Sequence, residues 1–325
     1  MAAQATLAQR LLSGERRALA QAITLVESTL ASHRQQALEL LEVLTPHTGN
    51  SLRIGISGAP GVGKSTFIEA LGNHLVENNH KVAVLAVDPS STLNGGSILG
   101  DKTRMEKLAL QANAYIRPSP AGNTLGGVAR RTRESLLLCE AAGFDIILIE
   151  TVGVGQSEVA VANMTDMFVL MLQPGSGDDL QGIKRGVIEL ADLILVNKAD
   201  GASAKLAEKT AHDYQSVLGL LQPKSEYWAP QVASISAFSN KHIEGVWHTV
   251  EGYFSKLEKN ISDLRNTQNI EWLWSETAER LMAELRADSA VKSAAEALEQ
   301  AVKQSDIPPT MAAEKLLSIF RENKP

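Results

Sequence analysis

The sequence predicts an α/β protein with a mainly parallel sheet, helices on both faces of the sheet, and N-terminal and C-terminal helical extensions. From about residue 52 to 258, short runs of apolar and β-branched residues alternate with amphipathic helical patterns. Such alternation is typical of parallel strands joined by crossover helices. A glycine-rich loop separates the first strand pattern from the first helical pattern. We therefore expect an N-terminal helical extension (1–48), an α/β domain (49–258) and a C-terminal helical arm (259–325).

The composition is that of an ordinary globular chain. Of 325 residues, 44% are hydrophobic and 21% are charged, and no apolar run approaches the ~20 residues of a membrane-spanning helix. The formal charge of −6 gives no sign of a nucleic-acid-binding surface. The single cysteine, Cys139, allows no disulfide within the chain. We therefore expect a cytoplasmic protein that binds neither membranes nor nucleic acids.

The N-terminal extension carries the pattern of two or three amphipathic helices between residues 4 and 44, with a break at Ser13-Gly14. A polar linker follows at 45–50. In the α/β domain, strands are expected at 52–57, 82–87, 113–117, 144–150, 166–173, 192–197 and 231–235. Helices are expected at 64–79, 101–111, 124–142, 157–163, 180–190, 203–220 and 241–258. Because the strands are parallel, ligand-binding loops are expected at their carboxyl ends.

The first strand leads into a complete G-x-x-x-x-G-K-[ST] motif, which is typical of P-loop NTPases. Its glycines let backbone N–H groups point inward, and the following helix adds the positive end of its dipole, so the loop suits a polyphosphate. Lys64 is expected to reach the β- and γ-phosphates, and the Ser65 hydroxyl to ligate Mg²⁺. The alternative is a chance glycine turn, which the strand–loop–helix context disfavours. The predicted phosphate-binding residues are Gly58, Ala59, Pro60, Gly61, Val62, Gly63, Lys64, Ser65 and Thr66.

Acidic residues near the ends of two other strands are candidates for the magnesium site. Asp88 directly follows the strand at 82–87, where an acid can hold Mg²⁺ or its water ligands. Asp101 either positions the metal or its water, or caps the first turn of a helix. Glu150 begins a Glu-Thr-Val-Gly turn in which the Gly153 N–H is expected to meet the γ-phosphate; a plain strand-ending turn is the alternative. We predict that Ser65, Asp88, Asp101 and Glu150 hold the metal.

An Asn-Lys-x-Asp motif at 197–200 follows a predicted strand and is typical of guanine recognition. The Asp200 carboxylate can accept from both N1–H and the 2-amino group of guanine, whereas adenine offers neither donor in that arrangement. Asn197 is expected to brace the loop, and the stem of Lys198 to cover the base. Ser236 and Ala237 follow the last strand, where the Ala237 N–H is expected to reach guanine O6. The order of these motifs favours GTP over ATP.

Two further features concern hydrolysis. Many regulatory GTPases carry a water-orienting glutamine directly after the glycine of the second motif, and here that residue is Val154. The segment from Gln173 to Arg185 is rich in glycines and acids, and is either a solvated loop or a third switch that a partner reads. In the second case Lys184 or Arg185 approaches the active site and acts like an arginine finger. We therefore expect a slow basal rate that a partner accelerates.

Four longer runs make the sequence similar to a known family. They are DPSSTLNGGSILGDKTRM (88–105), IRPSPAGNTLGGVARRT (116–132), IILIETVGVGQSE (146–158) and QGIKRG (181–186). On these runs the chain resembles the MeaB/ArgK family of GTPases, of the SIMIBI class of P-loop proteins, from Gly14 to about Phe254. The resemblance implies a GTPase that acts as a chaperone of adenosylcobalamin-dependent methylmalonyl-CoA mutase. Such a chaperone gates cofactor delivery and protects or reactivates the mutase. No cobalamin site is identifiable in the sequence itself.

Two alternative functions stay open. An older name for the family invokes an ATP- or GTP-dependent kinase of arginine and ornithine (LAO/AO) transport, although the sequence shows no separate phosphoacceptor signature. A nickel or cobalt metallochaperone of the same class is less favoured, because the seven histidines are scattered rather than gathered in a tract.

The resemblance also implies a homodimer formed through the C-terminal arm. In that arm Ile270, Trp274, Leu281 and Leu285 share one helical stripe, whereas Trp272 lies off it. An off-stripe tryptophan packs either against another chain or against the N-terminal helices of its own chain.

Overall fold

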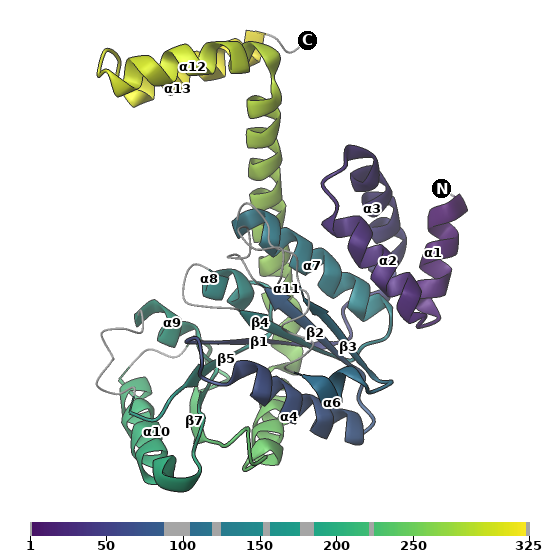
Figure 1. Cartoon of the computed structure of the whole chain (residues 1–325), viewed down its shortest axis with the longest axis vertical. Coiled ribbons are helices and arrows are strands. Elements are labelled where there is room, and N and C mark those ends of the chain that lie inside the picture. The colour runs from purple at the N-terminus through teal and green to yellow at the C-terminus, as the bar shows by residue number, and fades with distance from the viewer. Residues whose placement is uncertain are drawn as a thin grey trace. The chain divides into compact units, whose positions relative to one another are not determined.

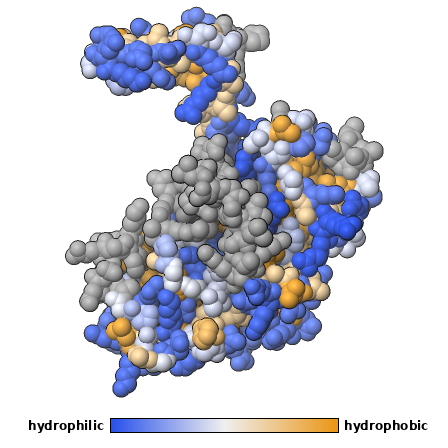
Figure 2. Space-filling model, viewed as in Figure 1, coloured by the Kyte–Doolittle hydropathy of each residue, from blue (hydrophilic) through white to orange (hydrophobic). Residues whose placement is uncertain are grey.

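The computed structural model describes residues 2–87, 105–118, 125–151, 157–175, 185–220 and 224–322 (Figure 1). The chain divides into two compact units, Met1–Arg265 and Asn266–Pro325. The boundary between them falls inside the long helix α11 (Ile243–Ala287). Hydrophilic residues cover most of the described surface in the view of Figure 2, with smaller hydrophobic patches between them.

The first unit is built on a seven-stranded sheet in which every strand pairs in parallel with its neighbours. The spatial order is β3-β2-β4-β1-β5-β6-β7, so β1 lies at the centre between β4 and β5. The α/β class with a parallel sheet is therefore confirmed, and each of the seven strands lies within about two residues of its predicted bounds. The strands are β1 (Leu52–Gly58), β2 (Val82–Val87), β3 (Ala114–Pro118), β4 (Ile146–Thr151), β5 (Met167–Leu172), β6 (Leu193–Val196) and β7 (Gln231–Ser234).

Both faces of the sheet are buried, because successive side chains of each strand enter different cores. In β2, Ala83 and Leu85 face one hydrophobic cluster while Val82 and Val84 face the other. The first cluster also takes side chains from the N-terminal helices and from the helices that follow β3 to β6, namely α1 (Ala2–Leu12), α2 (Arg16–Glu27), α3 (Ala31–Leu44), α7 (Leu125–Ala141), α8 (Ser157–Ala162), α9 (Arg185–Leu190) and α10 (Ala204–Leu218). The second cluster takes α4 (Lys64–Glu77), α6 (Glu106–Ala109) and the first turns of α11.

The N-terminal extension forms three helices, and the break expected at Ser13-Gly14 is present, with Gly14 in the left-handed region at a φ of 80°. The helices α2 and α3 pack on α7, on one face of the sheet (Figure 1). The N-terminal extension is therefore part of the same compact unit as the sheet.

The helix predicted at 241–258 is wrong at its carboxyl end, because α11 runs without interruption to Ala287. The sequence contains neither glycine nor proline from Tyr253 to Ala287, and the polar pair Lys259-Asn260 does not end the helix. Of the helices predicted at 101–111 and 180–190, the described parts are α6 and α9, while residues 101–104 and 180–184 lie outside the described ranges.

The second unit holds the end of α11 and a helical hairpin, in which α12 (Ser289–Lys303) packs against α13 (Pro309–Glu322). Of the predicted stripe on α11, Ile270, Trp274 and Leu281 are 54–68% exposed and Leu285 is partly buried. The off-stripe Trp272 is also partly buried. Among the described residues, no helix combines the length and apolar character that crossing a membrane requires.

Candidate nucleotide-binding site

The predicted phosphate loop joins the carboxyl end of β1 to the first turn of α4, at the centre of the sheet. At two of its glycines, neighbouring atoms come so close that a side chain would not fit. A Cβ on Gly58 would lie 2.4 Å from the Met171 carbonyl oxygen, and one on Gly63 would lie 2.5 Å from Asn197 Nδ2. Gly61 and Gly63 also have φ values of 76° and 97°, which other residues rarely adopt. The loop therefore needs glycine for its conformation and for its contacts.

The Lys64 side chain lies back over this loop. Its Nζ donates to the Gly58 carbonyl at 2.7 Å and to the Ala59 carbonyl at 3.2 Å, and the residue is 7% exposed. Val62 is fully buried and packs in the second hydrophobic cluster, which attaches the loop to the core. The ammonium group is thus already held at the loop whose amides are predicted to bind phosphate.

The predicted guanine loop is joined directly to the phosphate loop. Asn197 Nδ2 donates to the Val62 carbonyl at 2.8 Å, and Lys198 Nζ donates to the Gly61 carbonyl at 2.7 Å. Asn197 is 3% exposed, and Lys198 takes a left-handed conformation at a φ of 63°. Asn197 therefore braces the loop, as the motif predicts.

The loop after β7 completes this side of the site. Ser236 Oγ donates to Asp200 Oδ1 at 2.9 Å, so the buried serine orients the exposed aspartate. The Ala237 N–H donates to Asn197 Oδ1 at 3.0 Å. In this structure the Ala237 amide is therefore directed to Asn197. Its expected donation to guanine O6 stays a prediction.

On the metal side, the structure brings Ser65 and Glu150 together. Ser65 Oγ donates to Glu150 Oε1 at 3.1 Å, and Glu150 is 5% exposed at the end of β4. A hydroxyl and a carboxylate are the oxygen ligands that Mg²⁺ prefers, so this pair fits the predicted metal. Among the described residues no cluster of three or more metal-ligating side chains forms. Asp88, Asp101, Gly153, Val154 and Lys184 all lie outside the described ranges.

Sequence reasoning missed a contact between the end of β1, which leads into the phosphate loop, and the end of β4, which carries Glu150. Thr151 Oγ1 donates to Ser57 Oγ at 2.9 Å, and both residues are buried. Because Ile56 pairs with Glu150 in the sheet, the next residues on each strand, Ser57 and Thr151, are neighbours. The only sequence signal was a hydroxyl residue at the end of each strand.

A cluster of buried charges lies at the opposite, amino end of β1. The Glu140 carboxylate accepts from Arg53 Nε at 2.8 Å and Nη2 at 2.9 Å, from the Gly49 N–H at 2.9 Å and from the Ser51 hydroxyl. Burial of Glu140 opposes its ionisation, but the hydrogen bonds and charge of Arg53 outweigh it, so the pKa of Glu140 is lowered.

A second ion pair adjoins this cluster. Arg265 of α11 donates to both carboxylate oxygens of Asp166, at 2.8 and 2.7 Å, and also to the carbonyls of Gly49 and Ser51. The Asp166 carboxylate also accepts from the backbone N–H of Arg53, at 2.9 Å, and the Asp166 carbonyl accepts from the Tyr253 hydroxyl at 2.6 Å. Within the described ranges, the carboxylates of Glu140 and Asp166 at this end of the strand are thus both paired with arginines.

Comparison with known proteins gives a consistent result. The family model described as "Methylmalonyl Co-A mutase-associated GTPase MeaB" matches residues 19–290. The chain is 48% identical to the GTPase ArgK of Escherichia coli strain K12, over 88% of each chain. It is 46% identical to the mitochondrial methylmalonic aciduria type A homolog of Mus musculus, over 96% of this chain and 78% of that protein. The crystal structure of an LAO/AO transport system kinase matches with a TM-score of 0.78 and 38% identity, over 98% of both chains.

Proposed function

The chain belongs to the MeaB family of P-loop GTPases, and from that premise we propose that it assists an adenosylcobalamin-dependent methylmalonyl-CoA mutase in the cytoplasm. In this role it gates cofactor loading, and it protects or reactivates the mutase. The observation that carries the proposal is the family match over residues 19–290, and the relation to the methylmalonic aciduria type A homolog supports it.

The guanine base is recognised by Asp200, whose carboxylate accepts from N1–H and the 2-amino group. Support comes from the Ser236 hydroxyl, which fixes one Asp200 oxygen, and from Asn197, which ties the base loop to the phosphate loop. The stem of Lys198 covers the base from its position over Gly61. The loop that recognises the base and the loop that binds the phosphates are thus joined by two hydrogen bonds.

The phosphates are bound by the loop amides from Gly58 to Thr66, by Lys64 and by the Gly153 N–H. Ser65 and Glu150, with Asp88 and Asp101, would hold Mg²⁺. The ion would neutralise negative charge that develops on the phosphates during hydrolysis. The contact between Ser65 and Glu150 supports this assignment, because the two oxygens are already adjacent.

Hydrolysis is slow in the free protein and is accelerated by the mutase. The proposal rests on Val154, which replaces the usual water-orienting glutamine, and on Lys184, which acts in the transition state after docking. Single-turnover hydrolysis of GTP, with and without purified mutase, tests both points. Acceleration is expected for the parent and not for Lys184→Ala, while GTP binding stays intact. Equal acceleration of the two proteins would make the segment before Arg185 an ordinary loop.

We also propose that the protein is a homodimer through its C-terminal arm. Four side chains at helical spacing on α11 support this, because they are 54–68% exposed: Ile270, Leu273, Trp274 and Leu281. An exposed apolar stripe of this kind is typical of a surface that a partner covers. Trp274→Glu should convert the dimer to a monomer in sedimentation analysis, whereas Glu271→Gln, on the neighbouring exposed position, should not.

The second candidate is a kinase of arginine and ornithine transport, which the name of the solved LAO/AO transport system kinase favours. The two functions differ in the fate of the γ-phosphate. Incubation with γ-labelled GTP and ATP, followed by separate measurement of free phosphate and labelled protein, decides between them. A pull-down of native partners, with cobalamin assayed in the eluate, tests the association with the mutase.

A further inference from the structure

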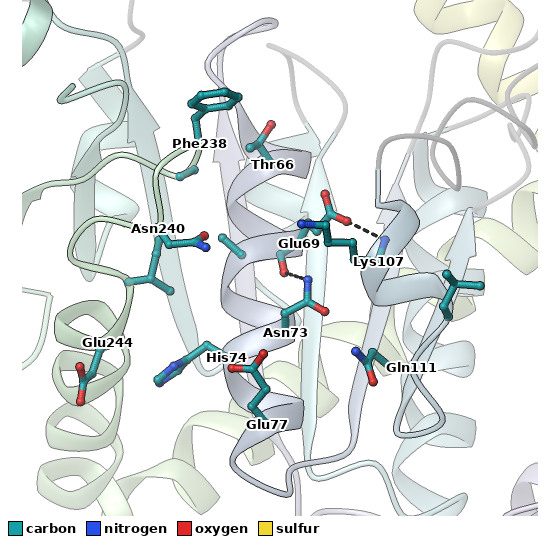
Figure 3. A pocket seen from close by; sticks show the side chains of 14 residues that line it. Thr66, Glu69, Asn73, His74, Glu77, Lys107, Gln111, Phe238, Asn240 and Glu244 are labelled. Carbon is teal, nitrogen blue, oxygen red and sulfur yellow. Dashed lines mark hydrogen bonds between the residues drawn. The ribbon is translucent and has the colours of Figure 1, made fainter. Parts of the chain in front are cut away.

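A groove of about 840 Å³ runs along the outer side of α4, from Thr66 in its first turn to Glu77 at its end (Figure 3). One wall is formed by α6 and the residues after it (107–111), and the other by the β7–α11 loop and the start of α11 (237–244). The groove lies entirely within the first compact unit. Its floor is the outward stripe of α4, at helical spacing: Thr66, Glu69, Ala70, Asn73, His74 and Glu77.

The groove carries an excess of negative charge. Glu69 and Glu77 lie on its floor and Glu244 on one wall, whereas Lys107 is the only lysine or arginine among its lining residues. Glu69 has a structural role, since its Oε1 accepts from the Lys107 backbone N–H at 2.8 Å. Glu77 on α4 and Glu244 on α11 are both exposed (Figure 3). Glu244 lies 3.8 Å from His248 Nε2 on its own helix, and because both carboxylates are exposed, a cationic partner can reach them.

Two large apolar side chains stand on the walls. Leu110 follows α6 and Phe238 follows the guanine-side loop, and each is 87% exposed. Apolar side chains left this open beside a groove are typical of surfaces that contact another protein. The excess of acidic side chains favours a cationic partner over a polyanion such as a nucleic acid or an anionic lipid surface, because like charges repel.

We propose that this groove binds a segment of the client mutase that carries lysine or arginine together with an apolar side chain. The inference rests on the proposed function for the identity of the partner, and on the groove for its chemistry. One end of the groove is formed by Thr66 and Ala237, which belong to the predicted phosphate- and guanine-binding loops. A segment docked here therefore touches both loops that hold the nucleotide.

Charge reversal tests the electrostatic part. In Glu77→Lys/Glu244→Lys, affinity for purified mutase should fall at least about tenfold, because like charges that face each other across an interface are strongly unfavourable. The matched control is Glu208→Lys/Asp213→Lys. It reverses two exposed acids on α10, neither of which lines the groove. The dissociation constant of the mutase complex is measured by calorimetry at two salt concentrations, with GTP affinity measured in parallel.

Truncation of an apolar anchor tests the second part. Leu110→Ala should weaken the complex about fivefold, as expected for a side chain that anchors an interface. Leu220→Ala is the matched control, since Leu220 is also 87% exposed but does not line the groove. Hydrogen exchange in the complex should show protection of the peptide that covers residues 66–77.

The outcomes separate the two proposals. If the parent binds the mutase and both groove variants bind as tightly as their controls, the groove is not the docking surface, while the proposed function stands. If the parent binds no mutase at all, both proposals are overturned. Protection confined to segments outside 66–77, 105–111 and 237–244 also overturns the proposed docking site.

Discussion

The two ends of the central strand β1 use charged residues in opposite ways. At the amino end, Arg53 and Glu140 form a buried, bidentate ion pair whose remaining hydrogen-bonding positions are filled by Ser51 and Gly49. At the carboxyl end, Lys64 donates to the carbonyls of Gly58 and Ala59 in the predicted phosphate loop, and Asp200 is exposed with one oxygen oriented by Ser236.

The difference indicates which charges stabilise the fold and which serve a ligand. A buried charge is tolerated when opposite charge and hydrogen bonds surround it, and its loss is then costly to stability. A charge aimed at a ligand is left with capacity for new partners. We therefore expect substitutions at the amino end to change stability without changing nucleotide affinity, and substitutions at the carboxyl end to do the reverse.

The largest effect is expected for Glu140→Ala. It leaves the Arg53 guanidinium buried without its carboxylate, and breaking such a pair typically costs about 3–5 kcal/mol of unfolding free energy. Urea unfolding measures the loss, and GTP affinity below the transition should match that of the parent. Glu42→Ala, which removes an exposed acid on α3, should stay within about 0.5 kcal/mol of the parent. Equal stability of the two variants would contradict the comparison.

Lys64→Ala is the counterpart at the carboxyl end. A charged hydrogen bond contributes about 1.5–3 kcal/mol, and Lys64 is expected to contact two phosphates, so GTP affinity should fall about a hundredfold or more. The measurement is equilibrium binding of a fluorescent GTP analogue. Thermal unfolding without nucleotide should remain close to the parent; a large drop in melting temperature would place Lys64 among the structural charges.

Asp200→Asn should reduce GTP affinity about ten- to a hundredfold, since it removes one charged hydrogen bond worth about 1.5–3 kcal/mol. The asparagine can still accept from Ser236, so the loop should keep its conformation, and xanthine nucleotides should gain affinity. Competition between GTP, XTP and ATP measures the exchange. Equal binding of ATP and GTP by the parent would falsify the guanine assignment.

The smallest effect concerns pH. Because the folded-state pKa of Glu140 is lowered from its ordinary value of 4.5, its stabilising contribution is complete above that value and is lost as the pH falls below it. Glu140→Gln removes this contribution at every pH. The difference in unfolding free energy between parent and Glu140→Gln should therefore shrink as the pH falls from 6 towards 4. A constant difference over that range would show that Glu140 does not titrate below its ordinary value.

Local sequence patterns were enough to predict the seven strands and the order of the motifs around them. Strand and helix periods are local properties, and the P-loop and Asn-Lys-x-Asp motifs carry their chemistry in a few adjacent residues. The sequence also predicted two or three N-terminal helices and the break between the first and the second, because Gly14 interrupts the pattern where the chain turns; the structure has three helices. The family followed from runs of residues long enough to be specific.

Which distant residues meet depends on the tertiary structure. The pairing of Arg53 with Glu140, the approach of Asn197 to Gly63 and the groove on α4 depend on strand order and register, which bring together residues about 30 to 180 positions apart. The length of α11 was misjudged because a polar pair resembles a linker in sequence, yet nothing in it breaks a helix. Local patterns fix the conformation of a segment, whereas packing between segments fixes which of its charges are paired and which remain open to a ligand.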